Sequence, residues 1–161
     1  MDRERLGRYA EMYSSTVFRA AYSYTGNHAD SEDIMQEAFM RLYRTEDKFM
    51  SDENVKAWLI RVAVNISKDY LKSAWRHKRA ELDESMTCEC IMDKELDEAM
   101  SKLKPEYRIT VFLYYYMGYT VRETAKILGI SETNTKARLK RAREKLKIFL
   151  TDENHERTVK L

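Results

Sequence analysis

Apolar residues recur every three or four positions through most of this chain, which is the spacing of one face of an α-helix. The first 25 residues show it most clearly, in the stripe Leu6, Tyr9, Tyr13, Val17, Ala20 and Tyr24. Gly26 follows this stripe, and glycine tolerates the left-handed backbone with which many helices end. The pattern therefore predicts one long helix that stops at Gly26.

Two further helices are predicted before residue 80. Asp30 is a candidate N-cap for the second helix, with Asp33 in the first turn, where a carboxylate interacts favourably with the helix dipole. The apolar positions of this helix are Ile34, Ala38, Phe39 and Leu42. After the polar segment 45–54, the third helix carries Val55, Trp58, Leu59, Val62, Ile66 and Tyr70.

The periodicity is lost over residues 80–95, and helical patterns return after it. A short helix is predicted over 94–103, and Pro105 suits the first position of the next helix. The apolar residues of that helix are Ile109, Phe112, Leu113 and Tyr116, and Gly118 predicts its end. The aromatic run 112–119 could stack on nucleic acid, but we expect aromatics spread around a helix to fill a core and its rim.

The segment 120–146 predicts two helices joined by a tight turn. Thr120 and Glu123 form a capping box ahead of the first helix, with Val121, Ala125 and Leu128 as apolar positions. Gly129 breaks the pattern, and Ser131 is the expected cap of the last helix. The buried face of the last helix is predicted to be Leu139, Ala142 and Leu146.

Composition excludes several classes of protein. The 161 residues include four glycines and one proline, too few for the turns of an all-β fold or for a glycine-rich phosphate loop. Sandwiches, barrels and P-loop or dinucleotide-binding enzymes are thereby excluded. Because 43% of the residues are hydrophobic, helical cores can still form. We therefore predict an all-α fold of two small helical modules.

The cysteines and histidines indicate neither catalysis nor a metal site. Cys88 and Cys90 are too close for an ordinary disulfide, and as a two-ligand fragment they are weak evidence for metal binding or redox sensing. We predict no catalytic residues, no metal and no cofactor. The chain lacks a signal-peptide core and any apolar run of the roughly 18 residues that a membrane span needs. A cytoplasmic protein without membrane contact is expected.

Charge is unevenly distributed although the net charge is only +2. Residues 66–80 contain five basic residues and one acidic residue, and residues 136–147 contain seven basic residues and one acidic residue. Between them, residues 81–98 contain eight acidic residues and one lysine. Two basic patches on either side of an acidic segment favour nucleic acid as a partner, although exposed helices of any soluble protein also carry charge.

The paired helices of 120–146 match a helix-turn-helix, whose second helix enters the major groove of DNA. Arginine and lysine on that helix can neutralise phosphates and donate to guanine edges. The candidate DNA-binding residues on this helix are Lys136, Arg138, Lys140, Arg141 and Arg143. The alternative is a solvated helix packed on its neighbour, with these residues serving solubility.

Two segments carry a family resemblance. TVRETAKILGISETNTKARLKRAREKL resembles region 4 of bacterial sigma factors, and HADSEDIMQEAFMRLY followed by VKAWLIRVAVNISKDYLKS resembles region 2. Both modules in this order, joined by a short linker, resemble the extracytoplasmic-function sigma factors. The implied organisation is region 2 over residues 1–80, an acidic linker over 81–95, region 4 over 96–150 and a C-terminal tail over 151–161.

The resemblance implies that the basic residues named above on the second helix of the helix-turn-helix are the −35 DNA-binding residues. It also assigns roles in the first module. Asp33, Gln36 and Glu37 occupy a D-I-x-Q-E motif that binds the β′ clamp of core RNA polymerase, and four-residue spacing lets the two carboxylates project from one face. Compensation of the helix dipole is an alternative role for Asp33. The segment 48–54 resembles the loop that receives a base flipped out of the −10 element. The implied −10 DNA-binding residues are Trp58, Arg61, Asn65, Lys68 and Lys72.

Three details qualify these roles. Trp58 could equally be a core residue, because Val55, Leu59 and Val62 surround it in the pattern. Arg76, Lys78 and Arg79 are further candidates for phosphate contacts. Asn134, Thr135 and Ala137 depart from the residues common in the family and are expected near the surface that reads DNA, so the −35 preference of relatives does not transfer.

The resemblance implies an alternative sigma factor that binds core RNA polymerase, at the β′ clamp and the β flap, and directs initiation at promoter DNA under the control of an anti-sigma factor. An alternative is a stand-alone helix-turn-helix regulator that binds operator DNA without polymerase. A second alternative is a helical adaptor that binds proteins and no DNA. Palindrome binding as a dimer would favour the first alternative, and indifference to nucleic acid would favour the second.

Overall fold

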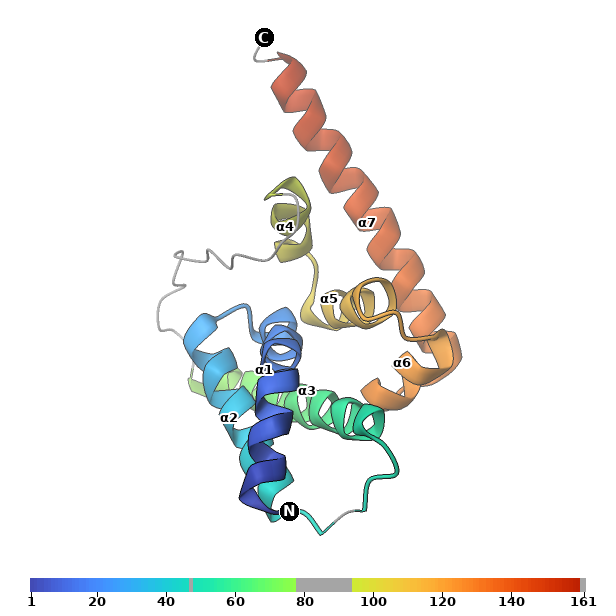
Figure 1. The fold of residues 1–161 in the computed structure, drawn as a ribbon. Coiled ribbons are helices and arrows are strands. Elements are labelled where there is room, and N and C mark those ends of the chain that lie inside the picture. Colours follow the sequence, from blue (N-terminus) through green and yellow to red (C-terminus); the bar gives the residue numbers. More distant parts are fainter. Residues whose placement is uncertain (47, 78–93, 160–161) are drawn as a thin grey trace. The chain divides into compact units, whose positions relative to one another are not determined.

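The structure, a computed structural model, describes residues 1–46, 48–77 and 94–159. The chain divides into two compact units, Met1–Thr87 and Cys88–Leu161. The described residues form seven α-helices and one short π-helical turn, with no strand among them (Figure 1). The predicted all-α fold of two modules is confirmed. Residues 81–93 of the predicted linker, with Cys88 and Cys90, lie outside the described residues, as do Lys78 and Arg79.

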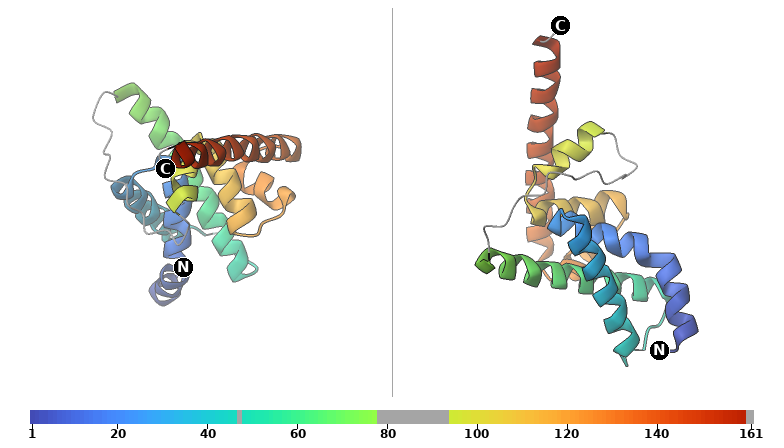
Figure 2. Two further views of the ribbon diagram at one scale, coloured as in Figure 1. Left: turned by 90° about the horizontal axis from the view of Figure 1, so that it is seen from above. Right: turned by 90° about the vertical axis from the view of Figure 1, so that its left-hand side faces the viewer.

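The first unit consists of helices α1 (Arg3–Thr25), α2 (His28–Arg44) and α3 (Asp52–His77), each of which contacts the other two. Asp2 caps α1 by accepting a hydrogen bond from the Arg5 amide, and Gly26 ends it at φ +63°, as predicted. The chain reverses at this point, and Figure 2 shows the three helices, blue to green, from two further directions.

The predicted start of α2 is wrong. The helix begins at His28 rather than after Asp30, and its N-cap is Asn27, whose side-chain oxygen accepts a hydrogen bond from the Asp30 amide at 3.0 Å. Asparagine is as good an N-cap as aspartate, and Asn27 follows directly on the reversal at Gly26, so the helix can start at once. Asp30 therefore lies in the first turn, and Asp33 lies in the second turn rather than the first.

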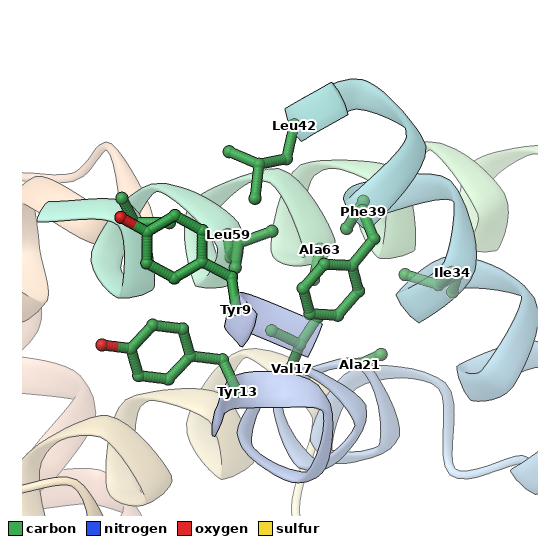
Figure 3. Packing of buried hydrophobic residues seen from close by; sticks show 11 residues of the cluster. Tyr9, Tyr13, Val17, Ala21, Ile34, Phe39, Leu42, Leu59 and Ala63 are labelled. Atoms are coloured by element: carbon green, nitrogen blue, oxygen red, sulfur yellow. The ribbon is translucent and has the colours of Figure 1, made fainter. Parts of the chain in front are cut away.

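A shared core holds the three helices together (Figure 3). Nine of the predicted apolar positions are among its buried members, which are Tyr9, Tyr13, Val17, Ala21, Ile34, Ala38, Phe39, Leu42, Val55, Leu59 and Ala63. The predicted positions Leu6, Trp58, Val62 and Ile66 are partly buried against it. Tyr70 is the exception to the predicted stripe of α3, because its side chain is 41% exposed. Its hydroxyl donates a hydrogen bond to Asp30, and this bond together with partial burial raises the pKa of Tyr70. Tyr70 thus ties α3 to the first turn of α2 from the surface.

The second unit consists of α4 (Lys94–Ser101), α5 (Pro105–Val111), the π-helical turn η1 (Phe112–Tyr116), α6 (Val121–Leu128) and α7 (Glu132–Val159). Pro105 occupies the first turn of α5, and Gly129 ends α6 with φ +67°, as predicted. The capping box is also confirmed: Thr120 Oγ1 accepts from the Glu123 amide at 3.1 Å, and Glu123 accepts from the Thr120 amide at 2.8 Å.

Helix α7 organises this unit. Ser131 caps it as predicted, because its Oγ accepts from the Asn134 amide at 3.0 Å. Leu139 and Ala142 of α7 are buried against Leu103, Tyr107 and Val111. The helix runs without a break past residue 150 to Val159, and Figure 2 shows it, in red, as a single straight rod. The residues predicted as a tail are therefore helical as far as Val159.

The aromatic run is only partly a core feature. Phe112 and Tyr119 are buried, whereas Tyr115 and Tyr116 are 52% and 41% exposed. In the wider turn of η1 the Met117 amide bonds back five residues to the carbonyl of Phe112. Tyr116 stacks on the buried Phe112, and Tyr115 meets Tyr114, which packs against the core. The run thus fills the core and its rim, as expected.

Candidate nucleic-acid and polymerase-binding surfaces

One side of α3 presents the residues that the sequence assigns to the −10 element. Trp58, Arg61, Asn65, Lys68 and Lys72 are three or four residues apart, which places them within an arc of roughly 80° on a helix. The side chains of Arg61, Asn65 and Lys72 are exposed, and that of Lys68 is half-buried. The opposite side of α3 is buried in the core. This face offers cationic and amide donors to solvent, as contacts to a DNA backbone and to base edges require.

Trp58 lies between the core and the candidate DNA-binding side of α3. Its side chain is half-buried and packs against the core cluster, while it stays on the same side of α3 as Arg61. Phe49 meets it edge to face, with ring centroids 5.8 Å apart. Trp58 therefore anchors the segment before α3 to the core. Next to Phe49, the side chain of Met50 is 92% exposed.

The exposed side of α7 presents most of the candidate −35 residues. Lys136, Lys140, Arg141 and Arg143 are exposed, and Arg138 is half-buried. Thr135 is fully buried, and its hydroxyl donates to the Ser131 carbonyl at 3.0 Å. The expectation that Thr135 lies near the reading surface is therefore wrong, because it faces the core beside Leu139. Asn134 is exposed and Ala137 is half-buried.

Arg143 has a partner outside α7 that no pattern in the sequence indicated. Its Nη1 donates a hydrogen bond to the hydroxyl of Tyr115 at 3.1 Å. Tyr115 in turn meets Tyr114 edge to face, with centroids 4.9 Å apart, and Tyr114 packs against the core. One member of the basic face is thus held in place by η1, through a contact between residues 28 positions apart.

The candidate polymerase-binding residues lie in the second and third turns of α2. Asp33 and Gln36 are exposed, and Glu37 is half-exposed. Glu37 accepts a hydrogen bond from Nε of Arg41 at 2.9 Å. Because this pair is exposed, it contributes little to stability and leaves Glu37 available to a stronger cationic partner. The structure therefore presents all three side chains of the motif to solvent from α2.

Two kinds of site are absent from the described parts of the chain. No group of three or more His, Cys, Asp or Glu side chains is placed there to hold a metal ion. No helix within the described ranges is long and apolar enough to cross a membrane.

Both units match one protein family. Residues 9–77 match Sigma-70 region 2, and residues 93–146 match Sigma-70, region 4. The ECF RNA polymerase sigma factor SigM of Bacillus subtilis (strain 168) is 33% identical over 150 residues, which cover 85% of this chain and 90% of that relative. The chain belongs to the extracytoplasmic-function (ECF) sigma factors. It is accordingly an alternative sigma factor, which binds core RNA polymerase and directs transcription initiation at promoters.

A second relative and a solved structure agree with this assignment. The RNA polymerase sigma factor SigV of B. subtilis (strain 168) is 27% identical over 150 residues, covering 88% of this ECF sigma factor and 89% of SigV. The sigma factor RpoE of Bartonella quintana, solved in complex with the anti-sigma factor NepR, superposes with a TM-score of 0.76. That match covers 92% of this chain and 98% of RpoE, and at 20% identity it shows the shared fold.

Proposed function

We propose a division of labour between the two units of this ECF sigma factor. Residues 1–80 bind core polymerase and melt the −10 element, residues 96–150 read the −35 element as duplex DNA, and residues 81–95 link the two. Residues 151–161 follow the −35 module as its C-terminal tail. The observation that supports this most strongly is that each matched region folds as a compact unit with its own solvent-facing polar surface. Weak contacts in each unit then add up, because the linker and the polymerase raise their effective concentration at one promoter.

On α2, Asp33, Gln36 and Glu37 bind the β′ clamp of the polymerase. Two carboxylates and an amide on adjacent turns match a surface of arginine side chains, since arginine forms strong charge-assisted hydrogen bonds with carboxylates. Their exposure supports the role, because none of the three is needed by the core of its own unit.

On α3, Arg61, Lys68 and Lys72 bind the backbone of the melted strand, while Asn65 pairs with a base edge and Trp58 supports the segment that receives a flipped base. Base flipping needs a pocket for the extruded base and a cationic track for its backbone. The side of α3 described above supplies the cationic track, and the segment before α3 is the proposed place for the base.

On α7, the basic residues Lys136, Arg138, Lys140, Arg141 and Arg143 bind −35 duplex DNA. Exposed cations close to the N-terminal end of a helix-turn-helix second helix suit the major groove, where they reach both phosphates and bases. The β flap of the polymerase is the proposed support for this unit.

An anti-sigma factor is the proposed regulator, because the structurally similar RpoE forms a complex with one. Such a protein would cover the basic faces of α3 and α7 and so compete with DNA. We also propose that the chain acts in the cytoplasm, where polymerase and promoter DNA are found, and that it has no catalytic activity, cofactor or metal of its own.

Run-off transcription with bacterial core polymerase on a library of promoter fragments tests this proposal. Transcripts that depend on the chain and begin downstream of one shared pair of motifs would support it and would supply the −10 and −35 sequences. Salt-dependent binding of the isolated chain to a palindrome, without new transcripts, would instead support a stand-alone regulator.

A further inference from the structure

Two tyrosines of α1 bind the first residue of α3. The Tyr9 hydroxyl donates to Oδ1 of Asp52 at 2.8 Å, and the Tyr13 hydroxyl donates to the backbone carbonyl of Asp52 at 3.2 Å. The two rings are stacked, with centroids 6.0 Å apart, and Figure 3 shows both hydroxyls leaving the core on the same side. One residue of α3 is therefore held through both its side chain and its backbone.

Arginines of α1 fix the direction of this contact. Arg5 donates to the Tyr9 hydroxyl from Nε at 3.3 Å and from Nη2 at 3.2 Å. Because arginine has no acceptor, the hydroxyl must accept from Arg5, and its own hydrogen is left for Asp52. Arg8 lies over the Tyr9 ring and forms an ion pair with Oδ1 of Asp52 at 3.6 Å.

The residues immediately before Asp52 are held at two further points. Ser51 Oγ accepts from the Asn54 amide at 3.2 Å and so caps the start of α3. Phe49 packs against Trp58. Between these anchors lies Met50, whose side chain is 92% exposed. The conformation of residues 48–51 thus depends on where the first turn of α3 is held, and Tyr9 and Tyr13 hold it.

We infer that Tyr9 and Tyr13 are positioning residues for −10 recognition, which they serve by fixing Asp52 and with it the segment 48–51. This inference rests on the proposed function of that segment and of α3. Neither tyrosine touches DNA in this role, since Tyr9 is fully buried and Tyr13 is 9% exposed. They restrict segment 48–51 to few conformations before it binds a base. The segment therefore loses less conformational entropy on binding.

The test uses Tyr9→Phe and Tyr13→Phe, which remove one hydroxyl each and leave the rings in the core. Tyr22→Phe is the matched control, because it removes a hydroxyl from the other end of α1, where Tyr22 stacks on Phe18. Holoenzyme made from the full chain is assayed on the promoter found with the library, on a −10-substituted copy and on a −35-substituted copy. Polymerase affinity and thermal unfolding are measured for each variant.

The −10 ratio is the ratio of transcription from the cognate promoter to that from its −10-substituted copy. We expect both test variants to lower it roughly three- to tenfold, the order of the net contribution of one hydrogen bond. The −35 ratio, which compares the cognate promoter with its −35-substituted copy, should match that of the wild type and of Tyr22→Phe. The affinity for polymerase should also match. A −10 ratio that stays at the wild-type value, or −10 and −35 ratios that fall together with polymerase affinity, would overturn the inference and leave the tyrosines a role in stability alone.

A double-mutant cycle with Asp52→Asn tests the contact itself. Asparagine keeps the size of the side chain but loses the charge that Tyr9 and Arg8 engage. If Tyr9 acts through Asp52, adding Tyr9→Phe to Asp52→Asn should lower the −10 ratio less than it does in the wild type. Full additivity would contradict the route through Asp52. Failure of the wild-type holoenzyme to select a −10 sequence would instead count against the proposed function.

Discussion

The hydroxyl of Tyr115 accepts a hydrogen bond from Nη1 of Arg143 at 3.1 Å, which joins the end of η1 to the basic face of α7. Both residues are exposed, so the contact serves the surface rather than the core. It restricts a long flexible side chain that would otherwise lose much of its rotamer freedom on binding DNA. In the proposed −35 role, Arg143 would therefore lose less rotamer freedom when it contacts a phosphate.

We predict that Arg143→Ala weakens binding to a −35 duplex and lowers the slope of log affinity against log salt by about 1, as expected for one lost phosphate contact. Tyr115→Phe should weaken binding by less, without changing the slope, and should have no effect in the Arg143→Ala background. Fluorescence anisotropy across a salt series measures this. Lys102→Ala, which removes a cation that follows α4 and lies over the Phe149 ring, is the control. An unchanged salt slope for Arg143→Ala would remove Arg143 from the interface.

Arg141 lies on the exposed side of α7. We predict that Arg141→Ala reduces −35-dependent transcription, by an amount equivalent to about 1–3 kcal/mol if the side chain reads a base. The affinity of the chain for core polymerase should not change. Transcription and polymerase binding are measured in parallel on the same preparation. An equal loss of polymerase affinity would contradict the assigned role.

Reversal of charge on α2 should separate polymerase binding from folding. We predict that Asp33→Lys with Glu37→Lys abolishes holoenzyme formation and preserves helicity, because both side chains are at least partly exposed and the Glu37–Arg41 ion pair contributes only about 0.3–0.5 kcal/mol. Glu11→Lys is the control, since Glu11 is exposed and lies on α1 rather than on the helix that carries the motif. Size-exclusion chromatography with core polymerase and circular dichroism measure the two properties. Retained polymerase binding would exclude Asp33 and Glu37 from the interface.

The capping box of α6 should make the stability of the second unit depend on pH. Hydrogen bonds from the backbone and side chain of Thr120 lower the pKa of Glu123. A lowered carboxyl pKa stabilises the fold above the pKa of the unfolded state, and this contribution is lost as the pH falls through the folded pKa. We predict that Glu123→Gln has a lower free energy of unfolding than the wild type at neutral pH. The difference between the two free energies should become smaller towards pH 3. Urea unfolding at both pH values measures it, and a constant difference would contradict the linkage.

Thr120→Ala removes the other half of the box and should cost about 1 kcal/mol of stability. Its effect should depend less on pH than that of Glu123→Gln, because the Thr120 side chain carries no titratable group. The same urea series measures both variants.

Thr124 offers a stabilising substitution. It is fully buried in α6, and its hydroxyl has no hydrogen-bond partner among the described residues. An unsatisfied buried hydroxyl costs about 1–3 kcal/mol, so we predict that Thr124→Val raises the free energy of unfolding by about 1 kcal/mol. Thr110→Val is the matched control, because Thr110 is equally buried but its hydroxyl donates to the Glu106 carbonyl at 2.6 Å. Chemical unfolding should show the control to be destabilised, and equal effects of the two substitutions would contradict the explanation.

Most of the helix ends discussed above could be predicted from residues close to them in the sequence. Gly26, Gly129, Ser131 and the Thr120–Glu123 box could be predicted because each acts through backbone groups three or four residues away. The start of α2 could not, because Asn27 and Asp30 are both good caps. The choice between them depends on how the chain leaves Gly26, which the packing of α2 on α1 decides.

The sequence by itself determined the all-α fold, the two modules and the candidate surfaces of α2, α3 and α7, because helical periodicity, capping residues and charge are local properties. Tertiary structure alone decided that Tyr70 and Tyr115 lie at the surface with partners on other helices, that Thr135 is buried, and that Tyr9 and Tyr13 hold Asp52. Each of these contacts joins residues far apart in the chain or depends on which neighbour covers a face. No pattern within one segment carries that information, because the free energy of such a contact exists only once the helices have packed.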